Sequence, residues 1–372
     1  MNEQAVKKQE KIIADRFEET GPIKAPLLEK ILSHDLKKVG ILGGAGVDPD
    51  GLASSTLMSA IIKNQNPDAV VIVYYRGTFD RPQNRTMRQS LALDVKSEND
   101  EVYGFNAQNT EAEPFTCIIS VDGPASVCPA VPHFIIDHHE QSGETPIIGD
   151  DVRKIGSASA IVWEYAIEAG IDFSTEDGAK LATALAIGIM TDTNNFGTQN
   201  SSSLDTEAYA FALEHKDSKL FNEIKNYPKP AYYIDMLSKG WDKRRQSGTV
   251  LVTGVGVIPR QRSGVISDLA EKYAELDGVN TAVVGAIIKD ESVIEISVRS
   301  SNNALNVDEF VRAAFGSGGG KRGAGRANII LPPIFKGLTE EHADQLWELT
   351  RTIIIDKALQ AAGDGERPAA QE

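Results

Sequence analysis

Short apolar runs alternate with helical patterns over the first half of the chain. Runs rich in apolar residues at 38–42, 69–75, 115–121 and 134–136 are typical of buried strands. Between and after these runs, apolar residues recur with a helical period at 52–62, 157–169 and 178–189. Strands that alternate with helices predict an α/β domain built around a mostly parallel sheet.

The second half of the chain has a different pattern. A helical stretch at 231–245 precedes a strand at 249–253, a helix at 264–276 and two strands at 281–289 and 293–299. This order predicts a second, smaller domain with a mixed sheet. We therefore expect a helical extension at 1–35, a larger domain at 36–215, a helical linker at 216–247, a smaller domain at 248–340, and a C-terminal helix with a disordered tail at 341–372.

Charge and cysteine usage narrow the classes of partner. The 53 acidic and 38 basic residues give a net charge of −15, whereas proteins that coat long nucleic acids usually present a basic face. No apolar run reaches the roughly 20 residues of a membrane helix, and no signal-peptide core is visible. The two cysteines, Cys117 and Cys128, lack the spacing of a zinc pair. We expect a cytoplasmic protein with no membrane partner.

Acidic residues follow three of the predicted strands and close one predicted helix. These residues are Asp48 and Asp50, Asp122, the run Asp137-His138-His139, and Asp192. The carboxyl ends of parallel strands meet at one edge of a sheet, so these side chains are predicted to converge.

A single aspartate at a strand end is usually a turn former or a helix cap. Two histidines beside several carboxylates favour a metal site instead, because oxygen and imidazole ligands suit Mn²⁺ or Mg²⁺. Carboxylates that share one crevice repel one another unless cations neutralise them. The pattern therefore predicts a two-metal cluster of the kind that supports in-line attack at phosphorus.

A glycine-rich run at 316–325 is the second candidate for function. Gly318, Gly319 and Gly320 lead directly into Lys321 and Arg322, and Arg299 closes the strand at 293–299. Glycine runs alone are often flexible loops. Backbone N–H groups in such a loop can also cradle an anion, and arginine offers a two-pronged contact to phosphate. The basic neighbours favour substrate binding.

These motifs resemble the DHH phosphoesterase family. The matching segments of the catalytic domain are Asp48-Pro-Asp50-Gly, Asp122, Asp137-His138-His139 and Gly188-Ile-Met-Thr-Asp192-Thr. The segment that ends in Arg299-Ser and the glycine run resemble the companion DHHA1 domain, so the resemblance covers roughly residues 38–335. The family includes RecJ-type exonucleases, nano-RNases that also dephosphorylate pAp, cyclic dinucleotide phosphodiesterases and exopolyphosphatase-like members.

The resemblance implies a role for each matched residue. Asp48, Asp50, Asp122, His138 and Asp192 would ligate two Mn²⁺ ions, or Mg²⁺ in their place, with Asp122 as the bridge. Asp137 would orient the His138 ring, and His139 would face the substrate.

The resemblance also implies an activity and a place for it. The active site would lie in a cleft between the two domains, where short oligonucleotides, cyclic dinucleotides or pAp would be hydrolysed by two-metal in-line water attack. The substrate would be held by Arg299 and by the glycine run, through Gly318, Gly319, Gly320, Lys321 and Arg322. A homodimer is compatible with this architecture, although no segment marks an interface.

Three positions depart from the family pattern, and two alternatives follow. Gly46 and Leu52 stand where the family has metal-ligating residues, which predicts a weaker metal position or another ligand there. Lys321 stands where the glycine motif usually carries histidine. One alternative is an exopolyphosphatase or pyrophosphatase that uses the same cluster. The other is a degenerate relative that binds nucleic acid or a partner without catalysis, although the retention of Asp122 and His138 argues against it.

Overall fold

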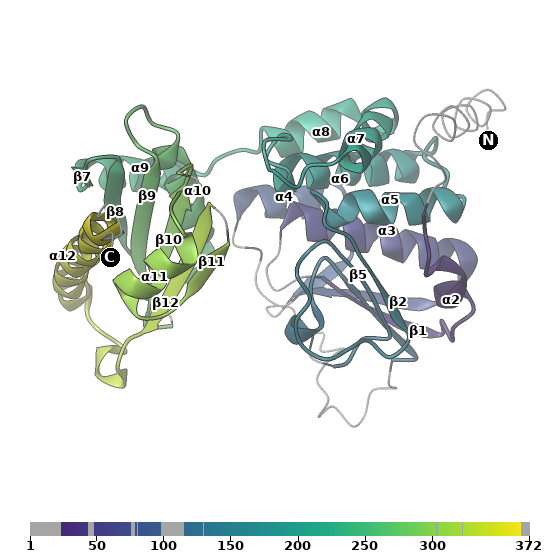
Figure 1. Ribbon diagram of the computed structural model, residues 1–372, viewed down its shortest axis with the longest axis horizontal. Helices are drawn as coiled ribbons and strands as arrows, with labels where there is room; N and C mark the ends of the chain where they lie inside the picture. The colour runs from purple at the N-terminus through teal and green to yellow at the C-terminus, as the bar shows by residue number, and fades with distance from the viewer. Residues whose placement is uncertain are drawn as a thin grey trace, which may run out of the picture. The chain divides into compact units, whose positions relative to one another are not determined.

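The chain forms two compact units, each with its own sheet (Figure 1). The computed structural model describes residues 24–43, 48–75, 79, 81–97, 115–128, 130–289, 291–302, 304–321 and 323–365. The first unit comprises residues 1–79 and 83–227, and the second comprises 80–82 and 228–372. The predicted α/β fold with two domains is confirmed. Gly46, Arg322 and most of the predicted N-terminal extension lie outside the described residues.

The first unit contains a six-stranded sheet whose described pairings are all parallel. The strands lie in the order β3 (Val95–Ser97), β2 (Val70–Tyr75), β1 (Lys38–Leu42), β4 (Cys117–Val121), β5 (Phe134–Asp137) and β6 (Gly149–Val152). From β1 the chain continues to β2 on one side and to β4 on the other. The strand order therefore reverses beside β1, and such a switch point is where doubly wound sheets bind ligands.

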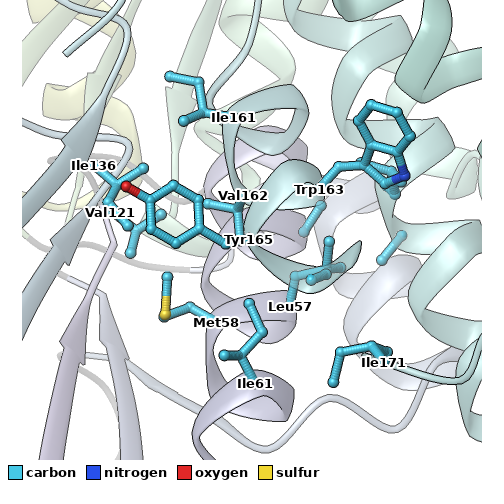
Figure 2. Packing of buried hydrophobic residues seen from close by; sticks show 14 of the residues in the cluster. Leu57, Met58, Ile61, Val121, Ile136, Ile161, Val162, Trp163, Tyr165 and Ile171 are labelled. Carbon is cyan, nitrogen blue, oxygen red and sulfur yellow. The ribbon is translucent and has the colours of Figure 1, made fainter. Parts of the chain in front are cut away.

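Helices α3 (Pro49–Gln65) and α5 (Ala158–Glu168) pack against the sheet and contribute much of the core of the first unit. The other helices of this unit are α2 (Leu28–Leu32), α4 (Pro82–Ser90), α6 (Glu176–Asp192), α7 (Ser203–His215) and α8 (Ser218–Lys225), with a short 3₁₀ turn at Ala125–Val127. Helix α3 contacts β1, β2 and β4, α5 contacts β5, and α6 packs on both helices. Figure 2 shows Met58 of α3 and Tyr165 of α5 gathered with Val121 and Ile136 of the sheet.

The second unit contains a mixed six-stranded sheet. Its strands lie in the order β11 (Gly319–Lys321), β12 (Ala324–Ile330), β10 (Val293–Ser300), β9 (Thr281–Ile288), β8 (Val250–Ile258) and β7 (Arg245–Ser247). Strands β8 and β9 are parallel, and the other neighbours are antiparallel. The glycine run was expected to be a loop, but Gly319–Lys321 form β11, which pairs with β12 and places Gly320 opposite Gly325.

Helices cover both faces of this mixed sheet. Alternate residues of β9 face opposite sides, so Ala282 and Val284 join a core with α9 (Ala231–Asp242) and α10 (Gly264–Ala274). Val283 joins a second core with α11 (Val307–Phe315) and α12 (Glu340–Gly365). Short 3₁₀ turns lie at Arg260–Arg262 and Pro333–Phe335. The double coverage explains why β9 is an uninterrupted apolar run.

Among the helices of the described ranges, none is both long and apolar enough to cross a membrane.

Candidate metal centre

Predicted ligands from four segments meet around the His138 ring. His138 Nε2 lies 3.3 Å from Asp122 Oδ1, 3.3 Å from Asp192 Oδ2 and 3.8 Å from Asp50 Oδ2. A Cβ atom on Gly51 would lie 3.0 Å from Asp122 Oδ2 and 3.3 Å from Asp48 Oδ1, which places both carboxylates beside this glycine. The first unit therefore brings all five sequence-predicted metal ligands into one neighbourhood.

The ends of secondary-structure elements place these ligands. Asp48 is the N-cap of α3, where its Oδ1 accepts the Gly51 amide N–H at 2.8 Å. Asp122 directly follows β4 with φ 59°, in the left-handed region that aspartate and asparagine tolerate better than most residues. His138 directly follows β5, and Asp192 is the last residue of α6. Each ligand thus depends on the position of a buried strand or helix.

A backbone carbonyl, and not Asp137, orients the His138 ring. His138 Nδ1 lies 3.1 Å from the Ile155 carbonyl oxygen, which can only accept, so Nδ1 carries the proton. The lone pair of Nε2 then points toward the carboxylates, as metal ligation requires. The expectation that Asp137 holds this ring is wrong, because its Oδ1 accepts the His138 backbone N–H at 2.8 Å and the His139 ring. The tight turn after β5 brings His139, and not His138, over that carboxylate.

Asp137 and His139 form a pair beside the ligands. His139 Nδ1 donates to Asp137 Oδ1 at 3.0 Å, and Gln141 Nε2 donates to Asp137 Oδ2 at 2.7 Å. The hydrogen bond to Asp137 raises the pKa of His139 above its usual value. Burial alone would raise the pKa of Asp137, but its hydrogen bonds with His139 and Gln141 hold that pKa below its usual value. The pair favours a protonated His139 whose ring is 36% exposed.

Asp50 is held by the amino terminus of α5. Its Oδ2 accepts the Ala158 N–H at 2.7 Å, and its Oδ1 accepts the Ser159 N–H at 2.9 Å. The side chain is almost fully buried, and burial together with the nearby Asp192 carboxylate raises the pKa of Asp50 to about 7. Two backbone amides therefore fix the direction of a carboxylate that is costly to ionise without a cation.

Two buried atoms in this cluster lack hydrogen-bond partners. Within the described part of the chain, Asp122 Oδ1 and His138 Nε2 are buried and have no such partner. Burial and the carboxylates of Asp48 and Asp50 raise the pKa of Asp122 well above its usual value. Burial lowers the pKa of His138, but Asp50 and Asp192 outweigh it and the net shift is upward. An unpartnered oxygen and an unpartnered imidazole nitrogen among carboxylates fit a divalent cation of the Mn²⁺ or Mg²⁺ type.

Sequence reasoning missed several residues that support the ligands. The Ile155 carbonyl and the α5 amides gave no signal, because any residue offers these groups. Asp205 was also missed, although Ser202-x-x-Asp205 has the spacing of a capping box. Leu52, at a family ligand position, is fully buried in the core from α3 and supplies no ligand.

Apart from Arg322, the predicted substrate-binding residues lie in the described part of the second unit. Arg299 Nε lies 3.2 Å from Glu271 Oε1, and its Nη1 donates to the Val298 carbonyl at 3.0 Å, so part of the fork is engaged. Burial lowers the pKa of Arg299. Gly318 has φ 94° at the start of the hairpin, and the Gly320 N–H donates to Asp308 Oδ1 at 2.9 Å. The Asp308 carboxylate therefore already accepts one backbone N–H of the expected anion cradle. Gly319 and Lys321 belong to the same strand, β11.

A second group of ligand-type side chains lies at the opposite ends of the strands. His34, Cys117 and His133 place ligand atoms within 4.8 Å of one another. However, His133 Nδ1 accepts the Ile118 N–H at 3.0 Å, so the remaining ring nitrogen of neutral His133 carries a proton. Burial also raises the pKa of the Cys117 thiol to about 12. We assign no metal to this group.

Known proteins resemble the chain over most of its length. No family model matches it. An uncharacterized protein of Methanocaldococcus jannaschii is 29% identical over 345 residues, which are 91% of this chain and 65% of the relative. An A-adding tRNA nucleotidyltransferase of Aquifex aeolicus is 28% identical over 201 residues, which are 52% of this chain and 23% of that enzyme. The chain thus spans less than two thirds of either relative.

A solved structure shows the same fold. An exopolyphosphatase-related protein from Bacteroides fragilis superimposes with a TM-score of 0.64 over 90% of this chain and 96% of its own. The two sequences are 16% identical, so the likeness concerns the fold. It supports the two-domain architecture that the DHH motifs predict.

Proposed function

We propose that the chain is a metal-dependent phosphoesterase of the DHH type that acts on short nucleotidic substrates. One observation carries the proposal: the unpartnered Asp122 Oδ1 and His138 Nε2 face each other at 3.3 Å among further carboxylates. The two comparisons that carry a functional name add support. One protein of the same fold is exopolyphosphatase-related, and one partial relative is a tRNA nucleotidyltransferase.

The proposed cofactor is a pair of Mn²⁺ ions, with Mg²⁺ as the alternative. The ligands would be Asp48, Asp50, Asp122, His138 and Asp192, with Asp122 between the two positions. When bound, such ions lower the pKa of a water molecule and offset the charge that develops on the phosphoryl oxygens. The protein's own contribution is to hold its ligands in fixed directions, through the Ile155 carbonyl and the α5 amides.

His139 would serve as the proton donor to the departing oxygen. Its Nδ1 is held by the buried Asp137 carboxylate, which raises the pKa of the ring and favours the protonated form. Its ring is partly exposed, whereas Asp137 is fully buried. Asp137 therefore positions and charges His139 without touching substrate itself. Arg299 and the β11–β12 hairpin of the second unit would hold the substrate.

A second candidate is a polyphosphatase or pyrophosphatase built on the same cluster. The ring of Tyr75, at the end of β2 beside the carboxylates, is fully buried and offers no face on which a base can stack. The name of the Bacteroides fragilis protein also favours this candidate. We place short nucleotidic substrates first because the Asp48-Pro-Asp50-Gly and Asp137-His138-His139 motifs resemble those of RecJ-type and nano-RNase-like members, although Gly46 and Leu52 depart from them. A cytoplasmic location and a homodimer stay predictions.

Hydrolysis of a substrate panel tests both candidates. The panel holds an RNA dinucleotide, a short DNA oligonucleotide, a cyclic dinucleotide, pAp and polyphosphate, each with Mn²⁺ and with EDTA. We expect Mn²⁺-dependent loss of the dinucleotide or pAp, and turnover of polyphosphate alone would transfer the proposal to the second candidate. Asp122→Asn should abolish turnover, whereas Asp217→Ala, at the exposed N-cap of α8, should not. No turnover of any substrate by the wild-type protein would refute the phosphoesterase proposal.

A further inference from the structure

One short segment contacts two of the proposed ligands at once. This clamp segment, residues 155–159, leads from β6 into α5. Its Ile155 carbonyl accepts the His138 ring N–H, and its Ala158 and Ser159 amides bind the Asp50 carboxylate. A displacement of the clamp segment would therefore turn both His138 and Asp50 away from their present directions.

The clamp segment also packs beside the end of α6, which carries the proposed ligand Asp192. A Cβ atom on Gly156 would lie 2.6 Å from Thr193 Cγ2 and 2.8 Å from Asp205 Oδ2, so the backbone lies directly against both side chains. Thr193 is buried and directly follows Asp192 at the end of α6. The position of Gly156 is thus coupled by contact to the helix end that carries Asp192.

A buried carboxylate on α7 anchors this segment. Asp205 is fully buried, and its Oδ2 accepts the Gly156 N–H at 2.9 Å while its Oδ1 accepts the Ser157 hydroxyl at 2.8 Å. The same carboxylate accepts the Ser202 N–H at 2.8 Å and the Ser202 hydroxyl at 2.7 Å. Asp205 therefore makes two hydrogen bonds to the clamp segment, one through each oxygen, and two to Ser202 at the start of α7.

We propose, building on the proposed function, that Asp205 is a positioning residue for the metal centre. It touches none of the ligands but fixes the clamp segment that orients His138 and Asp50. Without its carboxylate, the buried Gly156 N–H and Ser157 hydroxyl would lose their acceptors and the segment would shift to find new ones. Partners of this outer layer typically change metal affinity by roughly 10- to 100-fold when removed.

Mn²⁺ affinity, measured by titration calorimetry on the full chain, tests the proposal. Asp205→Ala should raise the dissociation constant by roughly 10- to 100-fold. Asp205→Asn should recover much of the loss, because its amide oxygen can still accept from Gly156 and its amide nitrogen can donate to the Ser157 hydroxyl. Ser157→Ala removes one of the two bonds between Asp205 and the clamp segment, together with the N-cap bond to the Ala160 N–H, and should weaken binding less than Asp205→Ala does.

The control is Asp217→Ala, which removes the N-cap of α8 but no contact with the clamp segment. It should lower stability as a lost cap does and leave Mn²⁺ affinity unchanged. Wild-type affinity in both Asp205→Ala and Ser157→Ala would overturn the positioning role and leave the proposed function standing. An equal loss in Asp217→Ala would overturn it as well, because the effect would then be general loosening. Absence of Mn²⁺ binding to the wild-type protein would instead overturn the proposed function.

Discussion

The buried Asp50 carboxyl gives the metal-free protein a specific dependence on pH. Its pKa is 3.8 in an unfolded chain and about 7 in the folded protein, because of burial and the neighbouring Asp192. The folded state therefore binds this proton more tightly than the unfolded state does. By linkage, the Asp50 contribution to the free energy of unfolding falls as the pH rises from about 4 to about 7 and is level above that.

The size of the effect follows from the shift. Each pKa unit corresponds to about 1.4 kcal/mol, so ionised Asp50 lowers stability by on the order of 4 kcal/mol at neutral pH and above. Between about pH 5 and about pH 8, the change is on the order of 2–3 kcal/mol. Asp50→Asn removes the titration and also loses one of the two bonds to α5, but that second loss is the same at both pH values.

The experiment is a comparison of two differences. Wild-type protein and Asp50→Asn are unfolded with urea in the presence of a chelator, at about pH 5 and at about pH 8, and the free energies of unfolding are extrapolated to water. The gap between the two proteins should move by roughly 2–3 kcal/mol in favour of the variant at the higher pH. A gap that is the same at both pH values would refute the reasoning, because Asp50 would then not titrate in this window.

Three further predictions concern single side chains. Asp122→Asn and Asp122→Ala should both abolish the Mn²⁺-induced rise in Tm. The alanine variant should be less stable than the asparagine variant by about 1 kcal/mol, because residue 122 has φ 59° and asparagine tolerates this left-handed conformation better. Equal stabilities of the two variants would contradict this backbone strain. Gly188→Ala places Cβ 2.6 Å from Ser159 Oγ. The variant should be less stable than the wild type, because an overpacking cost of about 1–3 kcal/mol exceeds the gain in helix propensity of about 1 kcal/mol. A raised Tm would contradict this overpacking. Cys117 is fully buried with a pKa of about 12, so a thiol reagent should modify the half-buried Cys128 first, and equal rates in the native protein would count against this.

The sequence predicted the elements whose patterns are local. The apolar runs marked the strands that precede Asp122 and Asp137, and the structure has strands there within two residues. The strand expected at 249–253 continues to Ile258 in the structure. The sequence did not predict this continuation because Gly254 and Gly256 interrupt the apolar pattern. A register irregularity between Gly254 and Val257 absorbs these glycines in the ladder.

The candidate site was predictable only where side chains reveal it. Carboxylates and imidazoles at strand ends are visible in the sequence as residue types, so the sequence predicted the proposed ligands. The support behind them was not, because the Ile155 carbonyl is a backbone group and its contact with His138 spans 17 positions. The contact between Asp205 and Gly156 spans 49 positions and depends on how α7 packs. The glycine run was misread as a loop because glycine has no side chain that could reveal a strand, and Gly320 pairs with another glycine, Gly325.

The wide spacing of the cluster along the chain has a consequence for protein synthesis. The proposed ligands extend from Asp48 to Asp192, and the proposed anchor of the clamp segment, Asp205, lies beyond them in α7. A nascent chain that still holds α7 inside the ribosome carries all the proposed carboxylate ligands but lacks the Asp205 bonds to the clamp segment. Tight binding of the proposed ions should therefore begin only after α7 has emerged, so that the growing polypeptide does not capture cations early.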